Sequence, residues 1–339
     1  MYSPKFRITP YLLNKTDEAA YLRSWIDHAP LQVAWLPVMQ KEARAKTAHF
    51  STSIEGNPLT LSQVRAIERG EKIGVPQTQE LEVENYLKAM RWIESEMVID
   101  LNEKTVFQLH RILTKGLLAE EKSGKYKEKQ NYIIDEKGIK SFTPPSPKET
   151  PQMMVALLAW ANSRPAKELH SVLICAILHH RLVSIHPFPD GNGRLARTLG
   201  TLILYQREYD LNHIFSLDEF FANNRKKYYM KLQQARELDD DLTYWIEYVA
   251  EGVVQTLKNV KQRIEDLQVT ASAPINLSPR QEEALRLLRD NPSIRSSELV
   301  KQLSVTRARM NQLLTPLIKS GLVAKEGESR ATRYRLNIH

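Results

Sequence analysis

One short stretch of this chain brings together residue types that can bind phosphates and move a proton. It starts at His186, runs through the turn Asp190-Gly191-Asn192-Gly193, and ends with Arg194 and Arg197. The apolar segment before it and the unbroken segment after it predict one helix on each side. A glycine-rich turn at the start of a helix directs unpaired N–H groups and the positive end of the helix dipole at one point. The stretch therefore predicts an anion site, which two arginines on one helix face would grip.

Two further side chains of the stretch suit the transfer of a phosphate-bearing group. Asp190 offers a hard oxygen ligand for Mg²⁺, which usually takes only one or two protein carboxylates beside phosphate oxygens. His186 stands at the entrance of the loop, where an imidazole can take a proton from a hydroxyl. Taken one by one, the turn, the arginines and the histidine also have ordinary structural explanations. Two cations at the positive end of a helix are unfavourable, however, and a bound anion would offset that cost.

The apolar spacing around this stretch predicts a mainly α-helical protein. Helix stop signals stand at Gly56-Asn57-Pro58, and Thr60 is expected to cap the next helix. Between 124 and 145 the pattern changes to short β-prone runs and a Pro-rich loop, which predicts a hairpin. The segments that we expect to be helical are 16–35, 38–53, 80–98, 102–119, 149–162, 167–185, 193–206, 223–238 and 241–267.

Composition is that of an ordinary globular protein. The 339 residues are too many for one ordinary core, and 42% hydrophobic with 26% charged residues argue against general disorder. The scarcity of glycine disfavours a glycine-rich dinucleotide fold. The single cysteine, Cys175, excludes a disulfide framework and a Cys-based zinc finger, and it fits a reducing cytoplasm. The longest apolar run, 172–178, is far shorter than the ~20 residues that span a bilayer, so we expect a cytoplasmic protein without a membrane segment or signal peptide.

The stretch from His186 to Arg197 resembles the signature of the Fic family, His-x-Phe-x-Asp/Glu-Gly-Asn-Gly-Arg-x-x-Arg, at every fixed position. The resemblance implies an all-helical core with a small hairpin flap. It also implies transfer of AMP from ATP to a Ser, Thr or Tyr hydroxyl of a target protein, with release of pyrophosphate. In this comparison His186 would be the general base, Phe188 a buried anchor of the loop, and Asp190 the Mg²⁺ ligand, while Arg197 would grip the γ-phosphate. The nucleotide-binding residues implied here are Gly191, Asn192, Gly193, Arg194, Leu195 and Arg197.

The hairpin at 124–145 resembles the Fic flap, which pairs with an extended target segment by β-addition. The family usually has Arg where this chain has Lys127, and an ordinary surface hairpin is the alternative. The segment from Arg225 resembles a helix that borders the adenine pocket of the family, although its tyrosines can equally belong to the core. The residues that the resemblance implies as nucleotide contacts in these two segments are Tyr132, Ile133, Ile134, Tyr228 and Tyr229.

A second motif resembles the inhibitory sequence of the family, Ser/Thr-x-x-x-Glu-Gly/Asn, and comprises Ser51, Glu55 and Gly56. Ser51 and Glu55 share one helix face, and a carboxylate in the last turn opposes the helix dipole unless a cation offsets it. The resemblance names Arg197 as that cation. The ion pair with Glu55 would occupy the arginine that should hold the γ-phosphate, so ATP would bind unproductively. This inhibition, which we call the brake, would act in cis. Some family members use this glutamate to remove AMP from the target, and that alternative stays open.

The last part of the chain has a different pattern. Residues 278–339 hold twelve basic and six acidic residues, so most of the net charge of +8 lies here. The expected order of three helices and a hairpin resembles a winged helix-turn-helix. Such a domain would bind either DNA or a protein partner, and the sequence favours neither. The candidate DNA contacts are Thr306, Arg307, Arg309, Asn311, Arg330 and Arg333.

These patterns predict four parts: an N-terminal helical region at 1–95, a Fic core at 96–267, a linker at 268–277 and a winged helix at 278–339. The leading function is a protein adenylyltransferase that uses ATP and Mg²⁺, acts on an unknown target protein and is inhibited in cis by Glu55. The resemblance also makes a homodimer plausible. The alternatives are a DNA-binding regulator whose Fic core senses nucleotide, and a transferase that uses another donor.

Overall fold

A computed structural model describes residues 2–29, 35–95, 100–134, 138, 140–207, 209, 213–270, 277–291, 293–319, 322–327 and 332–336. The chain divides into two compact units, one comprising 1–27 with 41–258 and the other 28–40 with 259–339. Each unit is described by itself.

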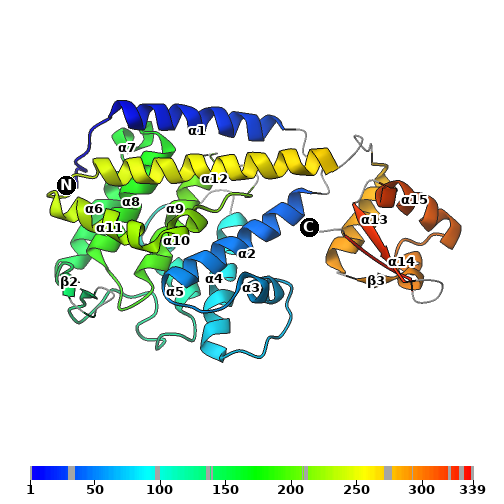
Figure 1. Ribbon diagram of the computed structural model, residues 1–339. Coiled ribbons are helices and arrows are strands. Elements are labelled where there is room, and N and C mark those ends of the chain that lie inside the picture. The colour runs from blue at the N-terminus through cyan, green and yellow to red at the C-terminus, as the bar shows by residue number, and fades with distance from the viewer. Residues whose placement is uncertain are drawn as a thin grey trace. The chain divides into compact units, whose positions relative to one another are not determined.

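The first unit is built around two buried helices that carry the ends of the candidate loop. Helix α8 (Ser171–Ile185) is buried on nearly all sides, and it packs against α9 (Asn192–Gln206). A helix that is apolar on nearly all sides belongs in the middle of a core. Helices α4 (Gln77–Ser95), α5 (Glu103–Thr114) and α6 (Thr150–Ala161) pack around this pair (Figure 1).

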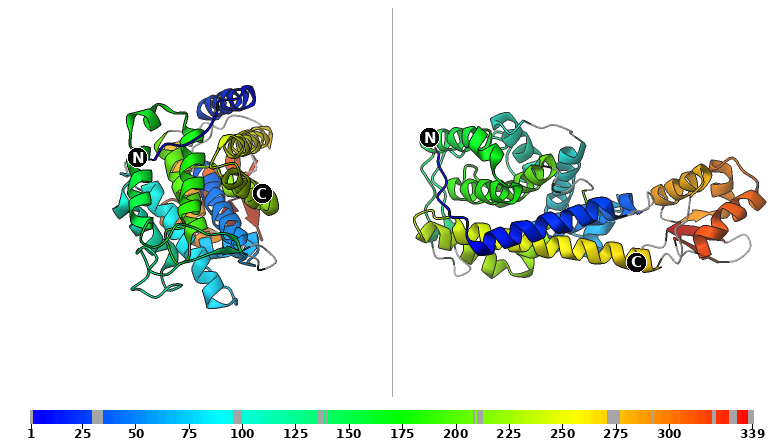
Figure 2. Two further views of the ribbon diagram at one scale, coloured as in Figure 1. Left: turned by 90° about the vertical axis from the view of Figure 1, so that its left-hand side faces the viewer. Right: turned by 90° about the horizontal axis from the view of Figure 1, so that it is seen from above.

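Helices α1 (Pro10–His28) and α12 (Thr243–Thr270) lie side by side along one flank of the first unit, as both figures show for residues 10–27 and 243–258 (Figures 1 and 2). Lys258 pairs with Glu18 at 2.6 Å across this contact. The first helix begins at Pro10, not at Thr16 as expected, because proline suits the first helical turn and the Thr9 hydroxyl accepts a hydrogen bond from the Leu12 N–H (3.1 Å).

The remaining helices differ from the sequence prediction mainly at their ends. The expected helix at 167–185 is split, because the His170 ring accepts a hydrogen bond from the Val172 N–H (3.3 Å) and starts α8 there. Helix α5 stops at Thr114 rather than at 119. Thr60 forms the expected N-cap, as part of a capping box with Gln63. The other helices of this unit are α2 (Leu36–Ile54), α3 (Leu61–Glu68), α7 (Arg164–Glu168), α10 (Leu217–Asn223), which was not expected, and α11 (Arg225–Glu237).

The expected hairpin is present as two short antiparallel strands, β1 (Ile133–Ile134) and β2 (Lys140–Phe142). Ile133 stands opposite Phe142, and Ile134 stands opposite Lys140, with an irregular register between the two pairs. The side chain of Asn131 ties the base of the hairpin to the loop after α8, because its Nδ2 donates to the carbonyls of His186 (3.2 Å) and Phe188 (3.0 Å). We call the described residues of this segment, 124–134, 138 and 140–145, the flap.

The second unit contains a small winged-helix fold. Its elements are α13 (Pro279–Asp290), β3 (Ile294–Arg295), α14 (Ser296–Gln302), α15 (Arg307–Lys319), β4 (Val323–Glu326) and β5 (Arg333–Leu336). The strands form an antiparallel sheet in the order β3-β5-β4, and the two-residue β3 was not expected. Ser278 forms a capping box with Gln281 at the start of α13, and Pro279 occupies the first helical position. Helix α12 continues to Thr270, into the segment expected to be a linker. Across the described ranges, no helix is both long and apolar enough to span a bilayer.

Candidate active site

The loop between α8 and α9 is fixed by a few specific contacts. Helix α8 ends at His186, which adopts a left-handed conformation (φ 50°). Phe188 is fully buried, and its ring stacks on His110 with centroids 3.9 Å apart. Asn192 braces the loop from inside: its Oδ1 accepts from the Phe188 N–H and its Nδ2 donates to the Phe188 carbonyl, both at 2.9 Å. The Asn192 side chain is therefore committed to the loop itself, and the anion hole expected there would consist of backbone N–H groups.

Those backbone groups belong to the first turn of α9. Gly191 is the N-cap and has φ 78°, which a residue with a side chain rarely adopts. The first turn presents its N–H groups without carbonyl partners inside the helix. Gly193 lines the pocket described below, and a Cβ there would collide with the Glu55 carboxylate. The close approach thus needs glycine, and it brings the carboxylate to the site where an anion would bind.

His186 has the geometry of a base. Its Nδ1 lies 3.3 Å from the Val183 carbonyl, which can only accept, so Nδ1 carries the proton. Nε2 has no hydrogen-bond partner among the described residues and the side chain lines the pocket. Burial lowers the pKa of His186 to about 4. The imidazole is therefore neutral at pH 7, with one nitrogen available to accept a proton.

Arg197 is the most heavily engaged side chain of the site. Its Nη2 donates to Glu55 Oε1 at 2.6 Å and to the Ser51 carbonyl at 3.0 Å, and its Nε donates to Ser51 Oγ at 2.7 Å. Asp218 of α10 lies 3.3 Å from Nε, and the Tyr228 hydroxyl lies 3.5 Å from Nη1. The pair of Glu55 and Arg197, which the resemblance implied, is thus present in the structure. Glu55 follows α2 directly instead of occupying its last turn, because the helix ends at Ile54 and Gly56 has φ 102°.

Asp218 was not singled out from the sequence. The carboxylate is fully buried, and burial raises its pKa to about 6 against the opposing effect of Arg197. No motif surrounds it, and it reaches the site only because α10 packs beside α11.

Arg194 lies apart from the pocket. Its guanidinium is buried and paired with Glu82 and Asp190, each at 3.0 Å. The Asp190 side chain is 62% exposed, so its carboxylate oxygens are accessible hard donors of the kind that Mg²⁺ prefers. This donor fits a magnesium ion that is shared with phosphates. Leu195 is buried in the core, and its N–H bonds to the Gly191 carbonyl (2.9 Å), so it does not reach the pocket.

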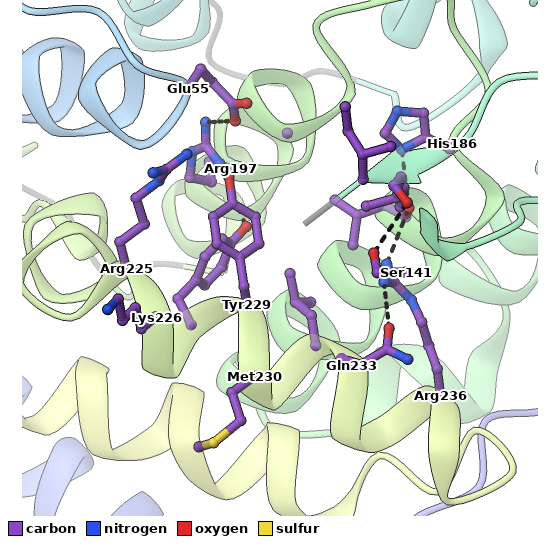
Figure 3. A pocket seen from close by; sticks show the side chains of 16 residues that line it. Glu55, Ser141, His186, Arg197, Arg225, Lys226, Tyr229, Met230, Gln233 and Arg236 are labelled. Atoms are coloured by element: carbon purple, nitrogen blue, oxygen red, sulfur yellow. Dashed lines mark hydrogen bonds and ion pairs between the residues drawn. The ribbon is translucent and has the colours of Figure 1, made fainter. Parts of the chain in front are cut away.

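One pocket of about 500 Å³ gathers the candidate residues of the first unit (Figure 3). Glu55 and Arg197 lie at one side and His186 at the other. Ile133 and Ile134 of the flap line it, as expected, whereas Tyr132 is 52% exposed, lies under Lys140 (4.5 Å to the ring centroid) and is not part of the lining. Tyr228 and Tyr229 both line the pocket from α11.

The two tyrosines have other partners as well. The Tyr228 hydroxyl bonds to His179 (2.9 Å) in the core, and the Tyr229 hydroxyl donates to the Ile54 carbonyl (3.4 Å). Several further lining residues were not singled out from the sequence, although a helical spacing of three, four and seven from Tyr229 would have found those of α11 except Met230. They are Ser141, Val183, Arg225, Lys226, Met230, Leu232, Gln233 and Arg236.

The winged-helix unit presents most of its candidate residues on the surface. Arg309 bonds to Gln312 (3.1 Å), and Thr306 caps the first turn of α15 by accepting from the Arg309 N–H (3.3 Å). Arg333 donates to the Ser293 carbonyl (3.3 Å). Arg330 lies outside the described residues. Thr306, Arg307, Arg309 and Asn311 are exposed at the start of α15.

The helical core, the flap and the loop between α8 and α9 define a Fic-type fold. Residues 100–204 match the Fic/DOC family, and residues 277–328 match the MarR family. The chain thus has one segment similar to the Fic/DOC family, followed by a second segment similar to the MarR family. A Fic family protein of Desulfovibrio desulfuricans G20 superposes over 99% of this chain and 98% of its own, with a TM-score of 0.72 at 23% identity. A Fic domain-containing signaling protein of Bacteroides thetaiotaomicron VPI-5482 has a TM-score of 0.63 at 24% identity, over 76% of this chain and 97% of its own.

Curated relatives carry an enzymatic name. "Protein adenylyltransferase Fic" of Drosophila melanogaster is 31% identical over 222 residues, which are 64% of this chain and 42% of that protein. The protein of the same name from Nematostella vectensis is 31% identical over 223 residues, covering 64% of this chain and 48% of its own. The match thus spans less than half the length of these relatives.

Proposed function

We propose that this protein transfers AMP from ATP to a hydroxyl group of a target protein, and that Glu55 inhibits the transfer in cis. The observation that carries the proposal is one pocket that holds a neutral histidine, a helix N-terminus and an arginine bound to a glutamate. The name of the curated relatives supports the same reaction class.

The chemistry follows from the positions of the residues. The target hydroxyl oxygen forms a bond to the α-phosphorus of ATP. The bond from that phosphorus to the bridging oxygen breaks, and pyrophosphate leaves with the electron pair. His186 Nε2 takes the hydroxyl proton, because Nδ1 already carries one and donates to Val183. The N–H groups at the start of α9 stabilise the charge that develops on the phosphate oxygens.

We further propose that Asp190 holds Mg²⁺ together with phosphate oxygens of the bound nucleotide. The ion would neutralise charge on the phosphates. Arg194 would keep the Asp190 carboxylate in place through its 3.0 Å contact. The Arg194 guanidinium is itself held by a second ion pair, with Glu82. Arg197 would bind the γ-phosphate once Glu55 leaves it. The reducing cytoplasm and the homodimer remain predictions of the sequence.

The test uses the Glu55→Gly variant, incubated with ATP and Mg²⁺. Intact-protein mass spectrometry should find a gain of one adenylyl group, and pyrophosphate should appear in step with it. Wild type should gain far less, and His186→Ala in the Glu55→Gly background should gain nothing measurable. A gain of a phosphate group, or of nothing in a folded Glu55→Gly protein, would contradict adenylyl transfer.

A second activity is proposed for the winged-helix unit, because residues 277–328 match the MarR family. We propose that the exposed first turn of α15, with Arg307 and Arg309, binds duplex DNA. Phosphate contacts make such binding salt-dependent, so affinity should fall steeply between 50 and 200 mM salt. Changing both arginines to glutamine should weaken binding and lower the salt slope. Binding to DNA that is insensitive to salt, or unchanged in the double variant, would contradict DNA recognition by this turn.

A further inference from the structure

Arg236, in the last turn of α11, connects the flap to the catalytic histidine. Its guanidinium lies 4.3 Å from the centroid of the Phe142 ring in β2. Its Nε donates to Ser184 Oγ at 3.1 Å and its Nη2 to the Val183 carbonyl at 3.5 Å, both in the last turn of α8. Nη1 donates to Gln233 Oε1 at 3.4 Å. Figure 3 shows this side chain rising from α11 toward the region of His186.

The Val183 carbonyl is the link between Arg236 and the base. It accepts from Arg236 Nη2 and also lies 3.3 Å from His186 Nδ1. One carbonyl oxygen therefore accepts two hydrogen bonds. One comes from His186 Nδ1 and fixes the histidine tautomer, and the other comes from Arg236 Nη2. A shift of the last turn of α8 would change both contacts together.

The Arg236 guanidinium also contacts the flap, through the ring of Phe142. Phe142 stands opposite Ile133 in the two-stranded hairpin, and Ile133 lines the pocket. A cation over an aromatic ring is favourable, and more so where both are shielded from water. The Arg236 guanidinium has no carboxylate within ion-pair distance among the described residues, so neutral acceptors and one ring hold this cation. Its contacts are thus divided between the flap and the last turn of α8.

We propose that Arg236 is a positioning residue that couples closure of the flap over the nucleotide to the orientation of His186. The inference rests on the proposed adenylyl transfer. In this arrangement, a flap that moves away from the pocket removes the Phe142 ring from Arg236. Arg236 is then held less firmly, and so is the Val183 carbonyl that orients His186. Transfer is then fast only while the flap covers the nucleotide.

Arg236 also acts on the charge of His186. The charged groups that face the histidine are Lys127 in the first part of the flap, Arg236 on α11 and Glu55 after α2. The two cations lower its pKa and the carboxylate raises it. Removing Arg236 should therefore raise the pKa of His186 and shift the acidic limb of the rate profile to higher pH.

The experiment compares variants in the Glu55→Gly background. Arg236→Met should lower the saturating rate of self-labelling by about tenfold, with the ATP concentration at half-maximal rate changed by less than about threefold. The acidic limb should move to higher pH. Arg236→Lys keeps the cation without the planar fork, so it should keep the acidic limb and recover only part of the rate. Lys231→Met is the matched control, because Lys231 lies on the same helix but bonds to Gln234 (2.9 Å) outside the pocket.

A second readout needs no turnover. Hydrogen exchange of the peptides that contain Ile133 and Phe142 should become about three- to tenfold faster in Arg236→Met, and unchanged in Lys231→Met. If the Glu55→Gly parent transfers nothing, the proposed function fails, while the exchange measurement still decides about Arg236. Unchanged flap exchange in both Arg236 variants would overturn the coupling. A loss confined to ATP affinity, with the saturating rate and the acidic limb unchanged, would also overturn it, since Arg236 would then only contact nucleotide.

Discussion

Replacing Glu55 by glutamine should strengthen the binding of ATP selectively over ADP. In the structure, Glu55 accepts a hydrogen bond from Arg197 Nη2 at 2.6 Å, and its side chain is 32% exposed. A charge-assisted hydrogen bond is worth about 1.5 to 3 kcal/mol, and partial exposure reduces this to about 1.5 to 2.5 kcal/mol. Glutamine keeps a neutral amide oxygen that accepts from Nη2 more weakly than the carboxylate does, so the γ-phosphate should displace it more easily and the Kd for ATP should fall by up to roughly 70-fold. ADP has no γ-phosphate and should gain less than about twofold.

Isothermal titration in the His186→Ala background measures both affinities without turnover. Glu251→Gln serves as the control, because it removes a carboxylate from a surface pair with Lys227 (3.6 Å) on the neighbouring helix. Equal gains for ATP and ADP would mean that Glu55 acts only through general charge repulsion. An unchanged Kd for ATP would refute the argument that Glu55 competes for the arginine of the γ-phosphate.

Two further predictions concern Asp218 and Arg225. The pKa of Asp218 is raised from 3.8 to about 6, so its contribution to stability is complete below about pH 4 and is lost as the pH rises through 6. Asp218→Asn should therefore gain up to about 3 kcal/mol of unfolding free energy relative to wild type between pH 4 and pH 7, measured by urea unfolding with tryptophan fluorescence; a constant difference across that window would contradict the assignment. Arg225 Nε donates to the Ile54 carbonyl at 2.8 Å and so fixes the peptide that precedes Glu55. Arg225→Met should raise self-labelling severalfold when Glu55 is present and should not raise it in the Glu55→Gly background, whereas equal increases in both would show that Arg225 acts outside the brake.

The loop from His186 to Arg197 could be predicted from the sequence because its residues are contiguous. A glycine-rich turn between two apolar segments predicts a helix–loop–helix, and the structure has this arrangement between α8 and α9. The contact of Glu55 with Arg197 joins residues that are 142 positions apart, and periodicity cannot pair them. That contact was reachable only through the family resemblance. Asp218 had no signal of either kind, since its element α10 is short and lies outside any motif.

The roles of individual polar side chains were the least predictable part of the site. The sequence places Asn192 at the start of a helix, where a free amide would suit an anion hole. The structure uses both amide atoms to hold Phe188, because a buried loop must satisfy its own backbone groups. Arg194 lies between Glu82 and Asp190 for another reason, since a buried cation needs carboxylate partners. Local pattern therefore identified the element, whereas packing determined where each side chain points.

Proton removal by His186 is tested most directly by the transfer of label from α-labelled ATP, measured as an initial rate in Glu55→Gly and in Glu55→Gly with His186→Ala. We predict rapid self-labelling in the first protein and a rate at least about 100-fold lower in the second, since general base catalysis contributes ~10² to 10⁴. Equal labelling of the two folded proteins would contradict the assignment of His186 as the base and the reaction built on it.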